Sequence, residues 1–129
     1  MSGILEGIRI VDVSRILAGP YATQMLADLG AEVIKIEAPW GDDTRQWGPP
    51  FTTGFDGKKV AAYFLSCNRG KEIVTFDLKR EAQEVRALIE TADVVVENFR
   101  PGTLERLLGP LPSNVILCSI SAYGATGPR

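Results

Sequence analysis

Residues 8–37 read IRIVDVSRILAGPYATQMLADLGAEVIKIE, and this stretch decides the fold. β-branched residues dominate both of its ends, at positions 8–13 and 31–36, as is typical of buried strands. Two such runs separated by a segment long enough for a helix favour a parallel pair, because parallel strands need a crossover connection. The stretch therefore predicts a βαβ unit.

The segment between the two runs has helical periodicity and marked ends. Tyr21, Met25 and Leu29 recur at every fourth position and fall on one face of a helix. Pro20 suits the first helical turn, where its missing N–H would have no partner, and Gly30 stands where helices often end in a left-handed residue.

The same alternation of strand and helix continues along the chain. A Pro- and Gly-rich loop follows Glu37, and we expect its Trp40, Trp47 and Phe51 to be buried by another part of the protein or by a second chain. Residues 60–65 then predict a helical turn or two. Strands are expected at 72–76, 94–96 and 115–120, and helices at 81–91 and 103–108. This order predicts an α/β fold with a doubly wound, mostly parallel sheet.

Composition indicates one globular domain and excludes several functions. The chain has 129 residues, of which 45% are hydrophobic and 23% charged. A net charge of −2 argues against nucleic-acid binding, and no apolar run approaches the roughly 20 residues of a membrane helix. With no targeting segment at the N-terminus, we expect a cytoplasmic protein without nucleic-acid or membrane partners.

The reactive side chains also limit the chemistry. The chain has no histidine, which excludes a Ser-His or Cys-His nucleophile and a His-ligated metal site within it, and we expect no metal. Cys67 and Cys118 lack CxxC spacing and are expected to be core or shell thiols. Neither GxGxxG nor GxxxxGK[ST] occurs, so the usual dinucleotide and P-loop sites are disfavoured.

Basic residues follow several of the expected strands. In doubly wound sheets ligands bind outside the carboxyl ends of the strands. Arg15, Lys79, Arg80 and Arg100 all lie in such positions, although the chain as a whole is acidic. This set suits a phosphorylated or otherwise anionic ligand, with solvated loop charges as the equal alternative.

Five motifs in order carry a resemblance to a known family. They are the βαβ stretch itself, GDDTRQWGPP, CNRGKEIVTFDLK, ADVVVENFRPG and ISAYGATGP. Together they resemble the N-terminal part of class III CoA-transferases, the family of formyl-CoA transferase and carnitine CoA-transferase. The GDDTRQWGPP form is similar to members that act on dicarboxylates, such as succinate–glutarate CoA-transferases.

The resemblance implies a Rossmann-like large domain, a small domain, an interlocked homodimer, and acyl-CoA and a carboxylic acid as substrates. Residues 1–129 would form the N-terminal CoA-binding segment of the large domain, without the small domain and the C-terminal part. By position, coenzyme A contacts carry over to Leu17, Ala18, Phe76, Lys79, Asn98, Phe99, Arg100 and Arg106.

The sequence differs from the pattern of the resembled family at three points that concern the binding and catalytic residues. Leu17 replaces a polar glutamine, and Ala38 replaces an arginine that flanks adenine in formyl-CoA transferase. The family's nucleophilic aspartate lies downstream of the YG motif, so we expect it beyond Arg129 and assign no catalytic residue within the chain.

Other functions remain open from the sequence. An acyl-CoA racemase of the same fold would use the same N-terminal half, and a noncatalytic CoA- or nucleotide-binding module would need the same contacts without the aspartate. A doubly wound domain without a ligand would require all five motifs to be accidental.

Overall fold

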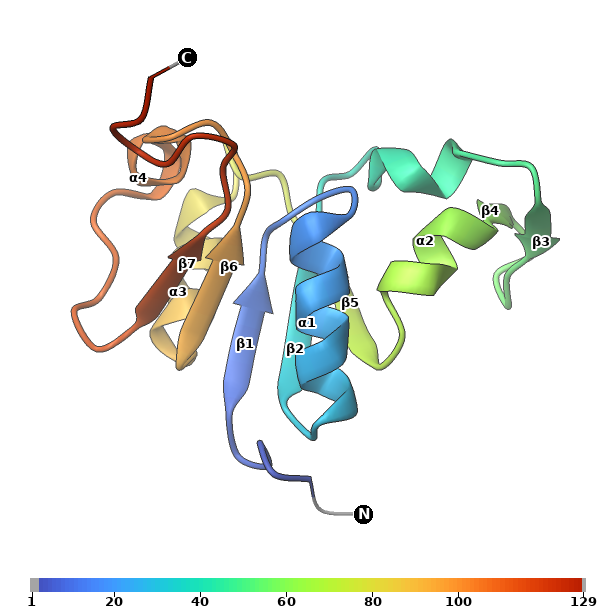
Figure 1. The fold of residues 1–129 in the computed structure, drawn as a ribbon, viewed down its shortest axis with the longest axis horizontal. Coiled ribbons are helices and arrows are strands. Elements are labelled where there is room, and N and C mark those ends of the chain that lie inside the picture. The colour runs from blue at the N-terminus through green and yellow to red at the C-terminus, as the bar shows by residue number, and fades with distance from the viewer. Residues whose placement is uncertain (1–2, 129) are drawn as a thin grey trace.

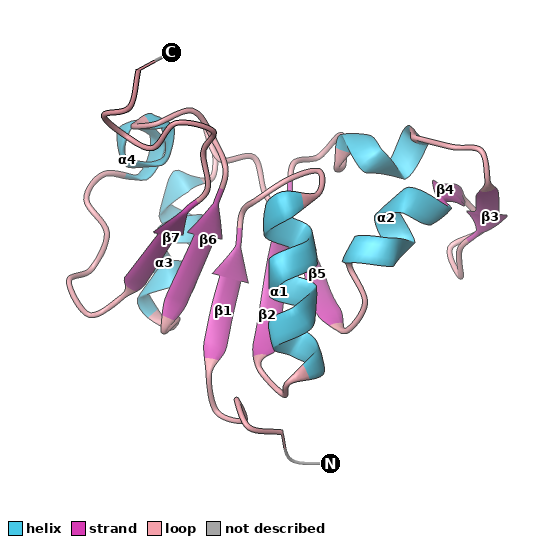
Figure 2. Ribbon diagram, in the orientation of Figure 1, coloured by secondary structure: helices cyan, strands magenta, loops and turns pink. Residues whose placement is uncertain are grey.

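The computed structural model describes residues 3–128 and contains a five-stranded parallel sheet with helices on both faces (Figures 1 and 2). The strand order is β5-β2-β1-β6-β7, and every neighbouring pair is parallel. The predicted α/β, doubly wound fold is thus confirmed. The elements are β1 (Arg9–Asp12), α1 (Ala18–Asp28), β2 (Glu32–Glu37), β3 (Phe51–Thr53), β4 (Lys59–Ala61), α2 (Ala62–Cys67), β5 (Lys71–Thr75), α3 (Ala82–Glu90), β6 (Val94–Glu97), α4 (Thr103–Leu108) and β7 (Ile116–Ser119).

Two hydrophobic clusters hold the layers together. Alternate residues of a strand point to opposite faces, so neighbours on β1 enter different clusters. Val11 belongs to a large cluster shared with α3 and α4, whereas Ile10 joins a smaller one with β2 and α1. Packing on both faces explains why the central residues of β1 and the first three residues of β6 are apolar.

Helix α1 is present as predicted, but its apolar stripe faces outward. Tyr21, Met25 and Leu29 are each about half exposed. The inner face instead carries small and polar residues, including Gly19 and Thr23, both buried. A Cβ at Gly19 would overlap the Ser14 side chain, so the close approach of α1 to the end of β1 requires glycine there.

The segment between β2 and β5 is more ordered than a simple loop. A short 3₁₀ helix, η1 (Asp43–Gln46), precedes the β3-β4 hairpin. Helix α2 covers residues 62–65 of the segment predicted as a helical turn, whereas Val60 and Ala61 belong to β4. Trp40, Trp47 and Phe51 are 69%, 47% and 46% exposed within this chain. Their burial by another part of the protein stays a prediction.

The expectation that both cysteines are core or shell thiols is wrong for Cys118, which lies on the edge strand β7. Cys67 is buried, but Cys118 is exposed, because β7 is an edge strand and all four of its residues are exposed. None of the helices within residues 3–128 combines the length and apolar character needed to cross a membrane.

Candidate functional site

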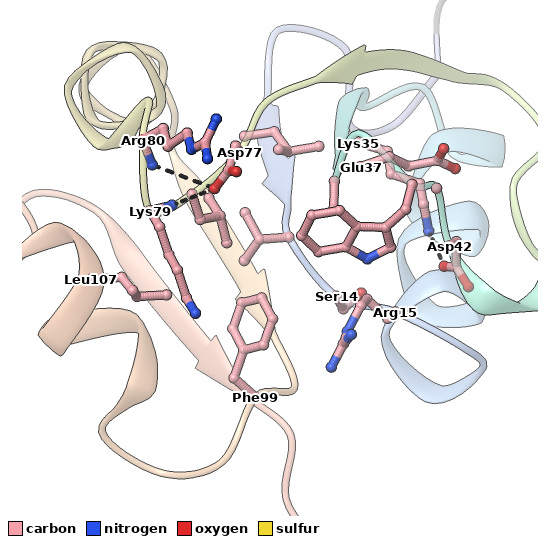
Figure 3. A pocket seen from close by; sticks show the side chains of 16 residues that line it. Ser14, Arg15, Lys35, Glu37, Asp42, Asp77, Lys79, Arg80, Phe99 and Leu107 are labelled. Carbon is pink, nitrogen blue, oxygen red and sulfur yellow. Dashed lines mark hydrogen bonds and ion pairs between the residues drawn. The ribbon is translucent and has the colours of Figure 1, made fainter.

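A cavity of about 440 Å³ lies at the carboxyl ends of β1, β2, β5 and β6 (Figure 3). The chain runs from β1 outward to β2 and β5, then crosses back to β6, so the strand order reverses between β1 and β6. Ligands of doubly wound sheets bind at this kind of switch point. The cavity is lined by Val13, Ser14, Arg15, Lys35, Ile36, Glu37, Ala38, Trp40, Gly41, Asp42, Asp77, Leu78, Lys79, Arg80, Phe99 and Leu107.

The loops after β1 and β6 are tied together across the switch point. The Arg15 backbone N–H donates to the side-chain oxygen of Asn98 at 2.9 Å, and the Asn98 amide donates back to the Arg15 carbonyl at 2.7 Å. The Arg15 guanidinium lies 5.6 Å from the centroid of the Phe99 ring. These contacts connect residues far apart in sequence and fix the position of Phe99 at the cavity wall.

The turn after β2 is anchored on both sides. Gly41 donates to the Ala38 carbonyl at 2.8 Å and closes the turn. Before it, the Glu37 carboxylate accepts two hydrogen bonds from Arg45 Nε at 2.9 and 3.0 Å. After it, Asp42 accepts from Lys35 Nζ at 2.9 Å.

Asp42 also connects this turn to the loop after β1. Its carboxylate accepts from the N–H and hydroxyl of Thr44 and, at 3.2 Å, from the N–H of Ile16. Ile16 has a φ of +72°, a left-handed conformation that is unfavourable for a β-branched residue. Burial alone would raise the pKa of Asp42, but the hydrogen bonds from Lys35 and Thr44 outweigh burial and hold the pKa below its ordinary value.

Three exposed cations surround the cavity, in addition to the buried Lys35. Arg15, Lys79 and Arg80 are exposed and line it, and within the described part of the chain none of them forms an ion pair. Asp77 orders the turn that carries two of them, because it accepts a hydrogen bond from the Lys79 N–H at 2.9 Å. Figure 3 shows these side chains around one opening. The predicted cluster of cations at the strand ends is therefore present in three of its four members.

Two smaller cavities of about 260 and 280 Å³ adjoin the first, and Phe99 lines all three. The third is lined by Asn98 and Arg100 together with residues 120–125 after β7. The fourth predicted cation thus lies beside the main cavity. The three hollows follow the carboxyl edge from β5 to β7, which suits an elongated ligand.

The other residues carried over from the resemblance lie outside the cavity walls. Leu17 and Ala18 are exposed at the start of α1, Phe76 is half-buried and packs on the large cluster, and Arg106 is exposed on α4. Their contacts with coenzyme A stay predictions.

Several wall residues were not singled out from the sequence. Leu107 reaches the cavity from α4, and Lys35 reaches it from within β2. A lysine inside the apolar run of residues 33–36 is a signal that could have marked a buried ion pair.

A second buried pair lies beneath α1. Lys71 Nζ lies 3.2 Å from the Asp12 carboxylate, and both side chains are inaccessible to solvent. Lys71 also donates to the Pro20 carbonyl and to Asn68, while Thr23 donates to Asp12. The pKa of Lys71 falls from 10.5 to about 8, chiefly because burial disfavours the ammonium, although Asp12 opposes the change.

This lowered pKa predicts a pH dependence of stability. Between about pH 8 and 10.5 the unfolded chain binds more protons at Lys71 than the folded chain does, so stability rises with pH in that window. The melting temperature of the full-length protein should therefore rise relative to that of Lys71→Met as the pH increases from 8 to 10. Parallel curves for the two proteins would contradict the prediction.

Comparison with known proteins gives the family. The model of CoA-transferase family III matches residues 5–129. The chain is 49% identical to the succinate–glutarate CoA-transferase of Agrobacterium fabrum over 96% of its length, and 47% identical to the succinyl-CoA:glutarate CoA-transferase of Mus musculus. It also superposes on a CAIB/BAIF family protein from Brucella suis with a TM-score of 0.91 and 47% identity, covering 99% of this chain and 36% of that one.

The chain spans 34% and 29% of the lengths of the two CoA-transferases, and so corresponds to about a third of such a protein. Its five motifs and its sheet fall within that shared part. The chain belongs to CoA-transferase family III.

Proposed function

We propose that the cavity binds the nucleotide end of coenzyme A within a class III CoA-transferase. The observation that carries the proposal is a group of three cations, Arg15, Lys79 and Arg80, that have no ion-pair partner within residues 3–128 and that surround a cavity at the topological switch point. Phosphate groups are strong acceptors for such cations. The neighbouring hollows lined by Phe99 would take the pantetheine arm along the same edge.

We further propose that the full-length protein moves CoA between an acyl-CoA and a dicarboxylic acid. Relatives named for succinyl-CoA with glutarate or mesaconate support this substrate class. An aspartate beyond Arg129 would attack the thioester carbonyl and expel the CoA thiolate, giving a mixed anhydride. The thiolate would then attack the aspartyl carbonyl, release the donor acid and leave an aspartyl-CoA thioester. The acceptor carboxylate would attack that thioester and expel the thiolate, giving a second mixed anhydride. Attack of the thiolate on the acceptor's acyl carbonyl would release the new acyl-CoA and regenerate the aspartate.

The proposal also covers the domain arrangement and the oligomeric state of the full-length protein. Residues 1–129 would form the N-terminal part of a large domain whose small domain lies further along the chain, in a cytoplasmic homodimer. Trp47, at the end of η1, and Phe51, in β3, are exposed, which supports their burial by the rest of the protein.

Replacing Lys79 tests the site. A charge-assisted contact with phosphate contributes roughly 1.5–3 kcal/mol, so Lys79→Ala in the full-length protein should weaken CoA binding about tenfold or more. Calorimetric titration with CoA measures the change. Lys58→Ala, on the exposed β3-β4 turn away from the cavity, is the matched control and should bind like the wild type. Equal affinity of the Lys79 variant and the wild type would remove the site assignment.

A further inference from the structure

Trp40 is held in an unusual way for a large aromatic residue. It occupies the third position of the turn from Ala38 to Gly41, where Pro39 and a left-handed Gly41, with φ +81°, restrict the backbone. The residues on either side of the turn, Glu37 and Asp42, are buried and ion-paired. The backbone that carries the indole is therefore fixed from both ends.

Within this chain the indole is left uncovered, and we take a ligand, instead of another part of the protein, as the group that covers it. Trp40 is 69% exposed although it lines the cavity, whereas its neighbours in the chain are engaged in the contacts above. Because the backbone of the turn is already fixed, only the side-chain torsions of Trp40 have to be ordered when a flat ligand stacks on its indole. The small side chain of Ala38, which lines the same cavity, leaves room beside it.

The cavity offers exposed cations and one free aromatic face, and the strand that leads to the aromatic residue lies between the strands that lead to the cations. Trp40 follows β2, whereas Lys79 and Arg80 follow β5 and Arg15 follows β1. Cations suit the phosphates of a nucleotide and a free aromatic face suits its base, since base–aromatic stacking needs no hydrogen-bond pattern.

We propose that Trp40 is the stacking platform for the adenine ring and makes the site selective for the nucleotide-bearing form of the substrate. The inference rests on the proposed function, because it assumes that the ligand is coenzyme A. Ala38 has only a methyl group beside the cavity, so in this proposal the contact with the adenine ring comes from Trp40.

Calorimetry with two probes tests the assignment in the full-length protein. CoA contains the adenine nucleotide, and 4′-phosphopantetheine lacks it. Trp40→Ala and Trp40→Leu should each weaken CoA binding at least about fivefold and leave phosphopantetheine binding unchanged, whereas Trp40→Phe, which keeps an aromatic face, should stay within about twofold of the wild type. Trp47→Ala is the matched control, because Trp47 is also exposed but contacts Tyr63 outside the cavity, and it should change neither affinity.

The outcomes separate the inference from the proposed function. If the wild type binds CoA and Trp40→Ala binds it equally well, the stacking of adenine on Trp40 is wrong, but the proposal that the cavity binds CoA is unaffected. If Trp40→Ala weakens both probes equally, the indole is a structural contact with the rest of the protein, and the inference is again overturned. If the wild type does not bind CoA at all, the proposed function fails as well.

Discussion

Residues 1–129 on their own are expected to leave succinyl-CoA and glutarate unreacted, whereas we expect the full-length protein to convert them to glutaryl-CoA and succinate. The carboxylates that line the cavity are already engaged, because Glu37 is paired with Arg45, Asp42 with Lys35, and Asp77 with backbone N–H groups. Because we expect the nucleophilic aspartate beyond Arg129, residues 1–129 alone lack the advantage of an oriented attacking group, roughly 7–11 kcal/mol. Chromatography of the CoA esters measures the result.

Trapping the covalent intermediate provides the control. In the full-length protein incubated with succinyl-CoA, hydroxylamine should modify an aspartate beyond Arg129, and mass spectrometry should find no modified peptide within residues 1–129. Enzyme-dependent glutaryl-CoA from the pure segment, or a modified carboxylate within it, would mean that the nucleophile has been misplaced.

Breaking the buried Lys35–Asp42 pair should cause the largest loss of stability among single substitutions at the site. Both side chains are 1% exposed, and the distance between Lys35 Nζ and the carboxylate is 2.9 Å. Lys35→Met leaves Asp42 as a buried charge without its cation, so the free energy of unfolding should fall by about 3–5 kcal/mol. Denaturant unfolding of the full-length protein, followed by circular dichroism, measures the change.

Two variants make this result specific. Lys35→Met combined with Asp42→Asn removes both charges and keeps one acceptor oxygen, which can serve the Thr44 N–H or the Ile16 N–H but not both, so it should recover part of the lost stability. Arg69→Met breaks an exposed pair of similar length with Asp28, and should cost less than about 1 kcal/mol. Equal losses in Lys35→Met and Arg69→Met would show that burial does not govern the contribution of these pairs.

The elements of the fold could be predicted because their local signals agree. The apolar run of residues 31–36 forms most of β2, which spans Glu32–Glu37, and the periodic segment 81–91 contains α3 (Ala82–Glu90). Phe51 and Thr53 gave no such signal, because the short β3-β4 hairpin lacks a buried face along β3. The strand order could not be predicted either, since it depends on which faces pack together rather than on any one segment.

The site was predictable only where it follows strand ends. Arg15 and Lys79 are far apart in sequence, yet the rule that parallel strands end at one edge places them around one cavity. Lys35 was missed because its side chain lies within a strand and reaches Asp42 through tertiary contact. The stripe of Tyr21 and Met25 shows the opposite error, since its period is helical but α1 buries Gly19 and Thr23 instead.

A crystal structure of the full-length protein with coenzyme A would show directly whether the nucleotide binds at the carboxyl ends of the strands. We expect difference density for the adenosine phosphates in the cavity between Lys79 and Phe99, with the adenine ring against Trp40 and the pantetheine arm running toward Arg100. Density for the nucleotide at any other edge of the sheet, with the Lys79 and Trp40 side chains in contact with solvent alone, would contradict it.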